Sequence, residues 1–126
     1  MRYVEVCNCD AQSNYECGGM MKPYCDYVKL CKCAEVALCA GRHTISDAKD
    51  GAIFEAPITN PKDRWGLFRI AKKRFEELDV KYVDIYVTGL TPALIAALNA
   101  ARVLDITVIL FHYDPNTFSY YQQEVF

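Results

Sequence analysis

The sequence predicts an α/β fold, with a mostly parallel sheet, helices on its faces, a C-terminal β-hairpin and a cysteine-rich N-terminal lobe. Residues 82–88 alternate between apolar and polar side chains as a strand does, and residues 106–111 are apolar on both faces. The apolar segment 92–104 between them has the length of a helix. Because a strand that is apolar on both faces is typical of a parallel sheet covered by helices, this β-turn-α-β unit sets the fold class.

All seven cysteines lie in the first third of the chain. Residues 2–9 and 27–33 are predicted strands, each with a Cys-x-Cys pair, and the polar segment 10–23 between them is a predicted loop. If the two strands pair as an antiparallel hairpin, four thiols converge and zinc stabilises a lobe that has little core of its own. This candidate metal set is Cys7, Cys9, Cys31 and Cys33.

Other interpretations of the cysteines remain open. The spacing differs from the Cys-x2-Cys of standard zinc modules, and Cys17 or Cys25 can replace a member of the set. Reduced cysteines that serve as small apolar residues are one alternative, and a redox or catalytic thiol is another. The odd number of cysteines, without an export signal, disfavours a disulfide framework.

The middle of the chain supplies a strand, an edge segment and a helix. Residues 34–40 are a predicted strand of the main sheet, and residues 52–58 are a predicted edge strand or extended cover. Asn60 followed by Pro61 predicts the start of a helix that runs to about residue 78. Its apolar residues recur at helical spacing, and the expected core face is Trp65, Phe68, Ala71, Phe75 and Leu78.

The second helix and the C-terminal hairpin complete the predicted fold. Thr91 is the expected N-cap, and Pro92 suits the first helical position. Residues 92–104 are apolar almost all round, so the helix lies between the sheet and another element or contacts a second subunit. Its alanine-rich side allows a close helix-to-helix approach. The aromatic segment 117–125 is predicted to return as a strand, at a sheet edge or a dimer contact.

Composition limits the class of function. The chain of 126 residues has the length of one domain, and its net charge of −2 argues against binding to duplex nucleic acid. The basic residues in 62–81 are interspersed with acidic ones, which favours a solvated helix face. No apolar run has the length of a membrane span and no signal sequence is evident, so we expect a cytoplasmic protein without a membrane partner. The common catalytic signatures are absent from the sequence.

Polar residues follow three predicted strands. His43 and His112, the two histidines of the chain, each come just after the carboxyl end of a strand. In a parallel sheet these ends lie on one rim with the turn 88–91, where open α/β sheets bind ligands and a helix start favours phosphate. The alternative is a turn that connects strand to helix and binds nothing. The candidate ligand-binding residues are Gly41, Thr44, Thr88, Gly89, Leu90, Thr91, Tyr113 and Asp114.

Several short motifs together carry a family resemblance. They are Arg42-His43, Gly51-Ala52-Ile53, Gly89-Leu90-Thr91-Pro92, Leu94 with Ala96-Ala97, and Phe111-His112-Tyr113. Over residues 34–114 this pattern resembles the small CRISPR-associated Rossmann-like proteins of the ring-nuclease and CARF type. The resemblance implies a Rossmann-like domain over 34–126 that binds cyclic oligoadenylates across a dimer interface. Residues 1–33, the cysteine-rich lobe, lie outside it.

The resemblance also implies roles for individual residues. In ring nucleases of this kind the ligand's 2′-hydroxyl attacks the adjacent phosphate, and no catalytic cofactor is needed. Arg42 would stabilise the phosphorane, and His43 or His112 would move protons. Thr88, Thr91 and the Leu90 amide would hold a phosphate, while tyrosines stack on bases.

Three functions follow as hypotheses. The first is a metal-independent phosphodiesterase that cleaves a cyclic oligonucleotide, and the second is a protein that sequesters the same ligand intact. Both imply a homodimer or higher homo-oligomer. The third is a zinc-stabilised protein–protein interaction module without a nucleotide ligand.

Overall fold

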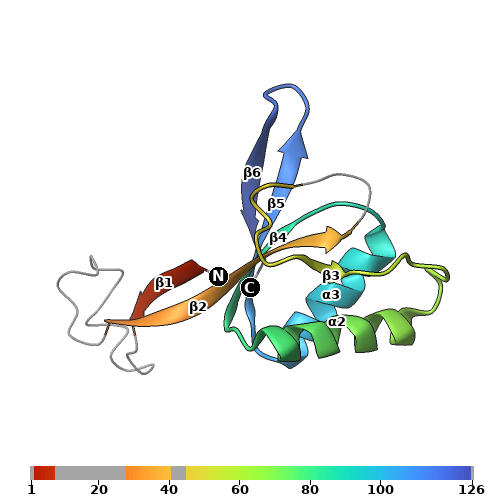
Figure 1. Ribbon diagram of the computed structural model, residues 1–126, viewed down its shortest axis with the longest axis horizontal. Helices are drawn as coiled ribbons and strands as arrows, with labels where there is room; N and C mark the ends of the chain where they lie inside the picture. Colours follow the sequence, from red (N-terminus) through yellow and green to blue (C-terminus); the bar gives the residue numbers. More distant parts are fainter. Residues whose placement is uncertain (1, 8–27, 41–44, 126) are drawn as a thin grey trace.

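The computed structural model describes residues 2–7, 28–40 and 45–125. The strands form one sheet of order β1-β2-β4-β5-β6, with β3 beside β2 (Figure 1). The elements are β1 (Arg2–Cys7), β2 (Val28–Cys39), β3 (Ala52–Phe54), α2 (Arg64–Leu78), β4 (Tyr82–Tyr86), α3 (Thr91–Val103), β5 (Thr107–Asp114) and β6 (Ser119–Glu124). The pairs β2/β3, β2/β4 and β4/β5 are parallel, and the pairs β1/β2 and β5/β6 are antiparallel. The predicted α/β class with a mostly parallel sheet is confirmed.

Strand β2 joins the N-terminal hairpin to the main sheet. The sequence predicted two strands, 27–33 and 34–40, but the structure has one continuous strand of 12 residues. No glycine or proline lies between residues 28 and 39 to interrupt it. On one edge of β2, Cys33 pairs with Arg2 of β1 and Ala37 pairs with Ala52 of β3. The boundary expected between residues 33 and 34 therefore falls inside a strand.

Helices α2 and α3 lie on the same side of the sheet (Figure 1). The chain passes from β2 through α2 to β4 and then through α3 to β5, so both crossovers step in the same direction along the sheet. Right-handed crossovers in one direction place their helices on one face. We expected helices on both faces, whereas in the described residues they cover one. The core on this face includes Leu38, Ile85 and Val108 from the strands.

Helix α2 begins three residues later than the sequence predicted. Asp63, rather than Asn60, is its N-cap, and the Asp63 Oδ1 accepts a hydrogen bond from the Gly66 N–H at 3.1 Å. The buried residues of the helix are Leu67, Ala71 and Phe75.

The predicted burial of Trp65 is wrong, because its side chain is 61% exposed. Trp65 precedes Leu67 by two residues, which places it about 160° around the helix axis from that core residue. The buried stripe therefore excludes it.

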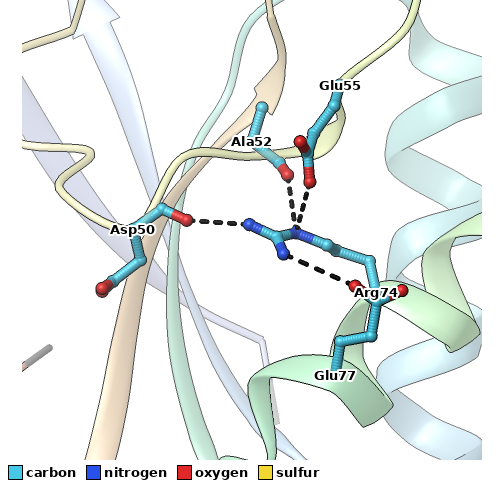
Figure 2. Close-up of polar contacts among 5 residues, drawn as sticks. All are labelled: Asp50, Ala52, Glu55, Arg74 and Glu77. Carbon is cyan, nitrogen blue, oxygen red and sulfur yellow. Dashed lines mark hydrogen bonds and ion pairs between the residues drawn. The ribbon is translucent and has the colours of Figure 1, made fainter.

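Arg74 connects α2 to the start of β3 (Figure 2). Its Nη2 donates to the Asp50 carbonyl at 2.9 Å, and its Nε donates to the Ala52 carbonyl at 3.0 Å. The same Nε lies 3.1 Å from the Glu55 carboxylate. A basic residue that the sequence assigned to a solvated helix face thus fixes a short edge strand against the helix layer.

Helix α3 contacts α2 and the sheet through alanine. Its buried residues are Ala93, Ala96, Ala97, Ala100 and Ala101. Small side chains let the two helices approach closely, as the sequence predicted. The outer side of α3 carries the exposed residues Ile95 and Val103. Within the described part of the chain, neither helix combines the length and apolar character that a membrane crossing needs.

The predicted C-terminal hairpin is confirmed, and it extends past the end of β4. Tyr86, the last residue of β4, pairs with Phe111, and β5 continues to Asp114 with β6 as its partner. The hairpin therefore projects beyond the carboxyl end of the parallel strands (Figure 1). At its tip, the Asp114 Oδ1 accepts a hydrogen bond from the Asn116 N–H at 2.9 Å.

Candidate functional site

The carboxyl ends of β2 and β4 are joined by a side chain. The Thr88 hydroxyl accepts a hydrogen bond from the Cys39 N–H at 3.3 Å and donates one to the Cys39 carbonyl at 3.2 Å. These bonds continue the connection beyond the last backbone pair of the two strands, Ala37 with Tyr86. The hydroxyl that the sequence assigned to a phosphate therefore has two partners within the fold.

Gly89 forms the tight turn that the sequence predicted. Its φ of 87° lies in the left-handed region, where a side chain is unfavourable. A Cβ at this position would also lie 2.9 Å from the Cys39 Sγ. The turn thus packs its backbone directly on the Cys39 side chain.

The Leu90 amide lies at the Cys39 thiol. Burial raises the pKa of this thiol, and a hydrogen bond from the Leu90 backbone opposes the rise. The thiol therefore stays neutral at physiological pH, which disfavours a nucleophilic role. The same contact uses an N–H group that the sequence assigned to phosphate binding.

The first turn of α3 carries no side-chain cap. Leu90, rather than the predicted Thr91, is the N-cap residue, and no side-chain hydrogen bond caps the turn. Thr91 and Pro92 are exposed, and no acidic residue lies in this turn. An uncapped helix start carries the positive end of the helix dipole, so it favours an anionic group.

Strand alternation separates two of the predicted site residues. The His112 Nε2 lies 2.8 Å from the Gln123 Oε1, and its ring stacks on Tyr121 at 5.2 Å between centroids. The Tyr113 ring instead contacts Tyr120 at 5.4 Å. Because neighbouring residues of a strand point to opposite faces, His112 and Tyr113 lie on the two faces of the hairpin.

Tyr86, Phe111, Tyr113 and Tyr120 form an aromatic cluster on the sheet face opposite the helices. Tyr86 stacks on Phe111 at 4.7 Å and meets Tyr120 edge to face at 5.1 Å. Tyr86 is buried, whereas Tyr113 is 49% exposed. Burial raises the pKa of the Tyr120 hydroxyl, and the charges of Tyr113 and Asp47 add to the rise. The cluster is thus a fixed set of rings with one ring open to solvent.

Of this cluster, only Tyr113 was a predicted site residue. Phe111 and Tyr113 alternate along β5, and Tyr120 lies opposite Tyr113 in β6. The alternation was visible in the sequence, but the pairing register that joins the rings depends on where the hairpin turns.

Two carboxylates share the aromatic face farther along the sheet. Asp84 of β4 is 3% exposed and pairs in register with Glu35 of the neighbouring strand β2. The Glu35 backbone N–H donates to the Asp50 Oδ2 at 2.8 Å. Both acidic residues have further interactions in the fold. This pair was not predicted from the sequence, because each residue is an isolated acid in an apolar strand.

Several predicted site residues lie outside the described residues. These are Gly41, Arg42, His43, Thr44 and Cys9. For Asp114, the structure gives a local role in the hairpin turn.

The backbone register of β1 and β2 gives the separation of two cysteines of the predicted zinc set. Cys7 pairs with Val28, and Cys33 pairs with Arg2. Val28 and Cys33 are five residues apart, so Cys7 and Cys33 are separated along the hairpin by about 16 Å. One ion cannot bind both at that distance. Among the described residues, no group of three or more His, Cys, Asp and Glu side chains could hold a metal ion.

The chain was compared with protein-family models, curated proteins and solved structures, and no match was found.

Proposed function

We propose that this chain binds a nucleotide ligand of the cyclic oligoadenylate type at the carboxyl end of its sheet. The observation that carries the proposal is the aromatic cluster on the hairpin, because its member Tyr86 ends β4 just before the turn that leads into the uncapped start of α3. A stacking surface and an anion-favouring helix start are the two features that a base linked to a phosphate requires.

The aromatic cluster supports base stacking. Tyr113 is half exposed and contacts Tyr120, which in turn contacts the buried Tyr86. A ring held in place loses little conformational freedom when a base stacks on it. Stacking on an aromatic side chain contributes about 1–3 kcal/mol per base, and it tolerates any base. The adenine preference in this proposal comes from the family resemblance.

The phosphate contact in this proposal is at Thr91. The Thr88 hydroxyl is bonded to Cys39, and the Leu90 amide lies at the Cys39 thiol. Thr91 is exposed in the first turn of α3 and offers both a hydroxyl and a main-chain N–H. A phosphate there gains from the helix dipole.

The same proposal includes three further points. The domain is Rossmann-like, the chain forms a homodimer, and the protein cleaves its ligand. A cyclic ligand with two-fold symmetry would contact the aromatic clusters of two chains. Arg42 and His43 retain the catalytic roles that the resemblance implies. His112 bonds Gln123 on the face opposite Tyr113, so the first candidate for proton transfer is His43.

The experiment incubates the protein with cyclic tetra-adenylate or cyclic hexa-adenylate and then analyses the denatured mixture by chromatography. Recovery of linear product identifies a nuclease, and recovery of bound but intact ligand identifies a sequestering protein. For a nuclease, Arg42→Ala and His43→Ala are expected to abolish product while circular dichroism stays unchanged. A protein that neither binds nor cleaves these ligands contradicts the proposal.

A further inference from the structure

A groove lies between the N-terminal parts of α2 and α3. Its volume is about 520 Å³, and it is lined by Arg64, Trp65, Pro92, Ile95, Ala96 and Asn99. Both helices begin at the right of the view in Figure 1. Trp65 is 61% exposed and Ile95 is 54% exposed. Large apolar side chains exposed together at a depression mark an interaction surface.

The exposed tryptophan is held in position. Its ring meets Phe68 edge to face, with 6.3 Å between centroids, and the Arg64 guanidinium lies 5.5 Å from its centroid. Pro92 and Ala96, which are shorter, form the opposite side of the groove. An aromatic ring beside a small apolar depression is the arrangement found at the centre of binding surfaces.

The charge of the groove is positive. Arg64 is the single charged residue among its lining residues. The neighbouring Asp63 carboxylate, which accepts the hydrogen bond from the Gly66 N–H, lines a different pocket. Neither helix has an acidic residue in its first turn. The complementary partner is therefore apolar with a negative charge.

A second copy of the same groove does not meet this requirement. A two-fold contact between equal grooves brings together two Arg64 side chains and no carboxylate from the lining residues. We propose that the groove docks a protein segment that carries acidic side chains next to large aliphatic ones, such as one face of an amphipathic helix. This inference goes beyond the nucleotide site and does not depend on it.

The test uses the fluorescence of Trp65, the only tryptophan of the chain. The full chain is titrated with three helical peptides of equal length that contain no aromatic residues. One has a leucine and glutamate face, one a leucine and lysine face, and one a serine and glutamate face. The expected result is a saturable blue shift with the leucine and glutamate peptide, and affinity for the lysine peptide lower by about fivefold or more.

Matched variants locate the binding. Ile95→Glu is expected to remove the response, because it places a carboxylate in the apolar groove. Val103→Glu changes an exposed residue of the same helix that does not line the groove, and it should respond as the unmodified chain does. Arg64→Glu should reverse the preference between the glutamate and lysine peptides. Circular dichroism establishes that each variant is folded.

Three results overturn the proposal. The first is the absence of a saturable shift with the leucine and glutamate peptide. The second is an equal response to the lysine or serine peptide, since the groove would then not select an acidic and apolar partner. The third is a blue shift that grows with protein concentration alone, because a second copy would then cover the groove.

Discussion

The Thr88 hydroxyl joins the ends of β2 and β4 by accepting a hydrogen bond from the Cys39 N–H and donating one to the Cys39 carbonyl. Thr88→Val keeps the shape of the side chain and removes both bonds. We expect a loss of about 1–3 kcal/mol in the free energy of unfolding, because two main-chain groups lose their partner. Urea unfolding measures the loss. The control is Thr91→Val, at an exposed position in the same turn. Its free energy of unfolding should stay near that of the wild type. Equal stability of the two variants would show that the Thr88 bonds contribute nothing.

Gly89→Ala is expected to destabilise the chain for two separable reasons. The φ of 87° is unfavourable for alanine by about 1–2 kcal/mol, and the new Cβ meets the Cys39 sulfur. Urea unfolding of Gly89→Ala, Cys39→Ala and the double variant separates the two effects. The double variant should regain the part due to the sulfur contact. If the changes in the free energy of unfolding of the two single variants simply add up in the double variant, positions 89 and 39 are not in direct contact.

Two aromatic residues of α2 should differ sharply when replaced by alanine. Phe75 is 1% exposed within the core, so Phe75→Ala should lower the free energy of unfolding by about 3–5 kcal/mol. Trp65 is 61% exposed, and Trp65→Ala should change the free energy of unfolding by about 0.5 kcal/mol or less. Chemical unfolding followed by circular dichroism gives both values. A large loss at Trp65 would mean that this ring belongs to the core after all.

Replacement of Arg74 should loosen the start of β3. Arg74→Met removes the donors to the Asp50 and Ala52 carbonyls, and hydrogen bonds from a charged donor contribute about 1.5–3 kcal/mol each. We expect a lower unfolding midpoint and faster amide hydrogen exchange in residues 51–54. Lys73→Met, at an exposed position of the same helix, is the control. Unchanged exchange in residues 51–54 would show that β3 is held without Arg74.

The Cys39 thiol should make stability decline in alkaline solution. Burial raises its pKa above the ordinary value of 9.0, so the unfolded chain releases this proton at lower pH than the folded chain. The protonated thiol therefore adds to the free energy of unfolding. This contribution is fully present below pH 9.0, the ordinary pKa of the thiol, and is lost as the pH rises through the folded-state pKa. Urea midpoints from about pH 8 to about pH 10.5 measure the decline, and Cys39→Ala should show a smaller one. Identical pH profiles would contradict the raised pKa.

Local sequence patterns were sufficient to predict most of the described elements. The alternation around Ile85 and the apolar segment that contains Val108 mark two strands whose parallel pairing follows from the helix between them. The buried alanines of α3 were visible as an apolar helix with small side chains. These features depend on neighbours in the sequence, which the period of a helix or strand records directly.

Features that depend on distant contacts were not predicted. The exposure of Trp65 follows from the rotation of α2 relative to the sheet, which is fixed by the burial of Leu67 and Phe75. The partners of Arg74 are backbone carbonyls 22 and 24 residues earlier, and no side-chain pattern records them.

At the candidate site, the prediction that His112 and Tyr113 follow the end of a strand was wrong, because β5 continues to Asp114 and its alternation places the two side chains on opposite faces. The register of β5 and β6, by contrast, depends on where the hairpin turns, and it was not predicted from the sequence.

Calorimetric titration measures whether a cyclic oligoadenylate binds at the aromatic cluster. The two tyrosines for comparison lie on opposite faces of the hairpin and are similarly exposed, Tyr113 at 49% and Tyr121 at 56%. We expect saturable binding of cyclic tetra-adenylate or cyclic hexa-adenylate to the wild-type chain. We also expect a loss of about 1–3 kcal/mol for Tyr113→Ala and no change for Tyr121→Ala. Absence of binding, or equal affinity of Tyr113→Ala and the wild type, would contradict the proposal.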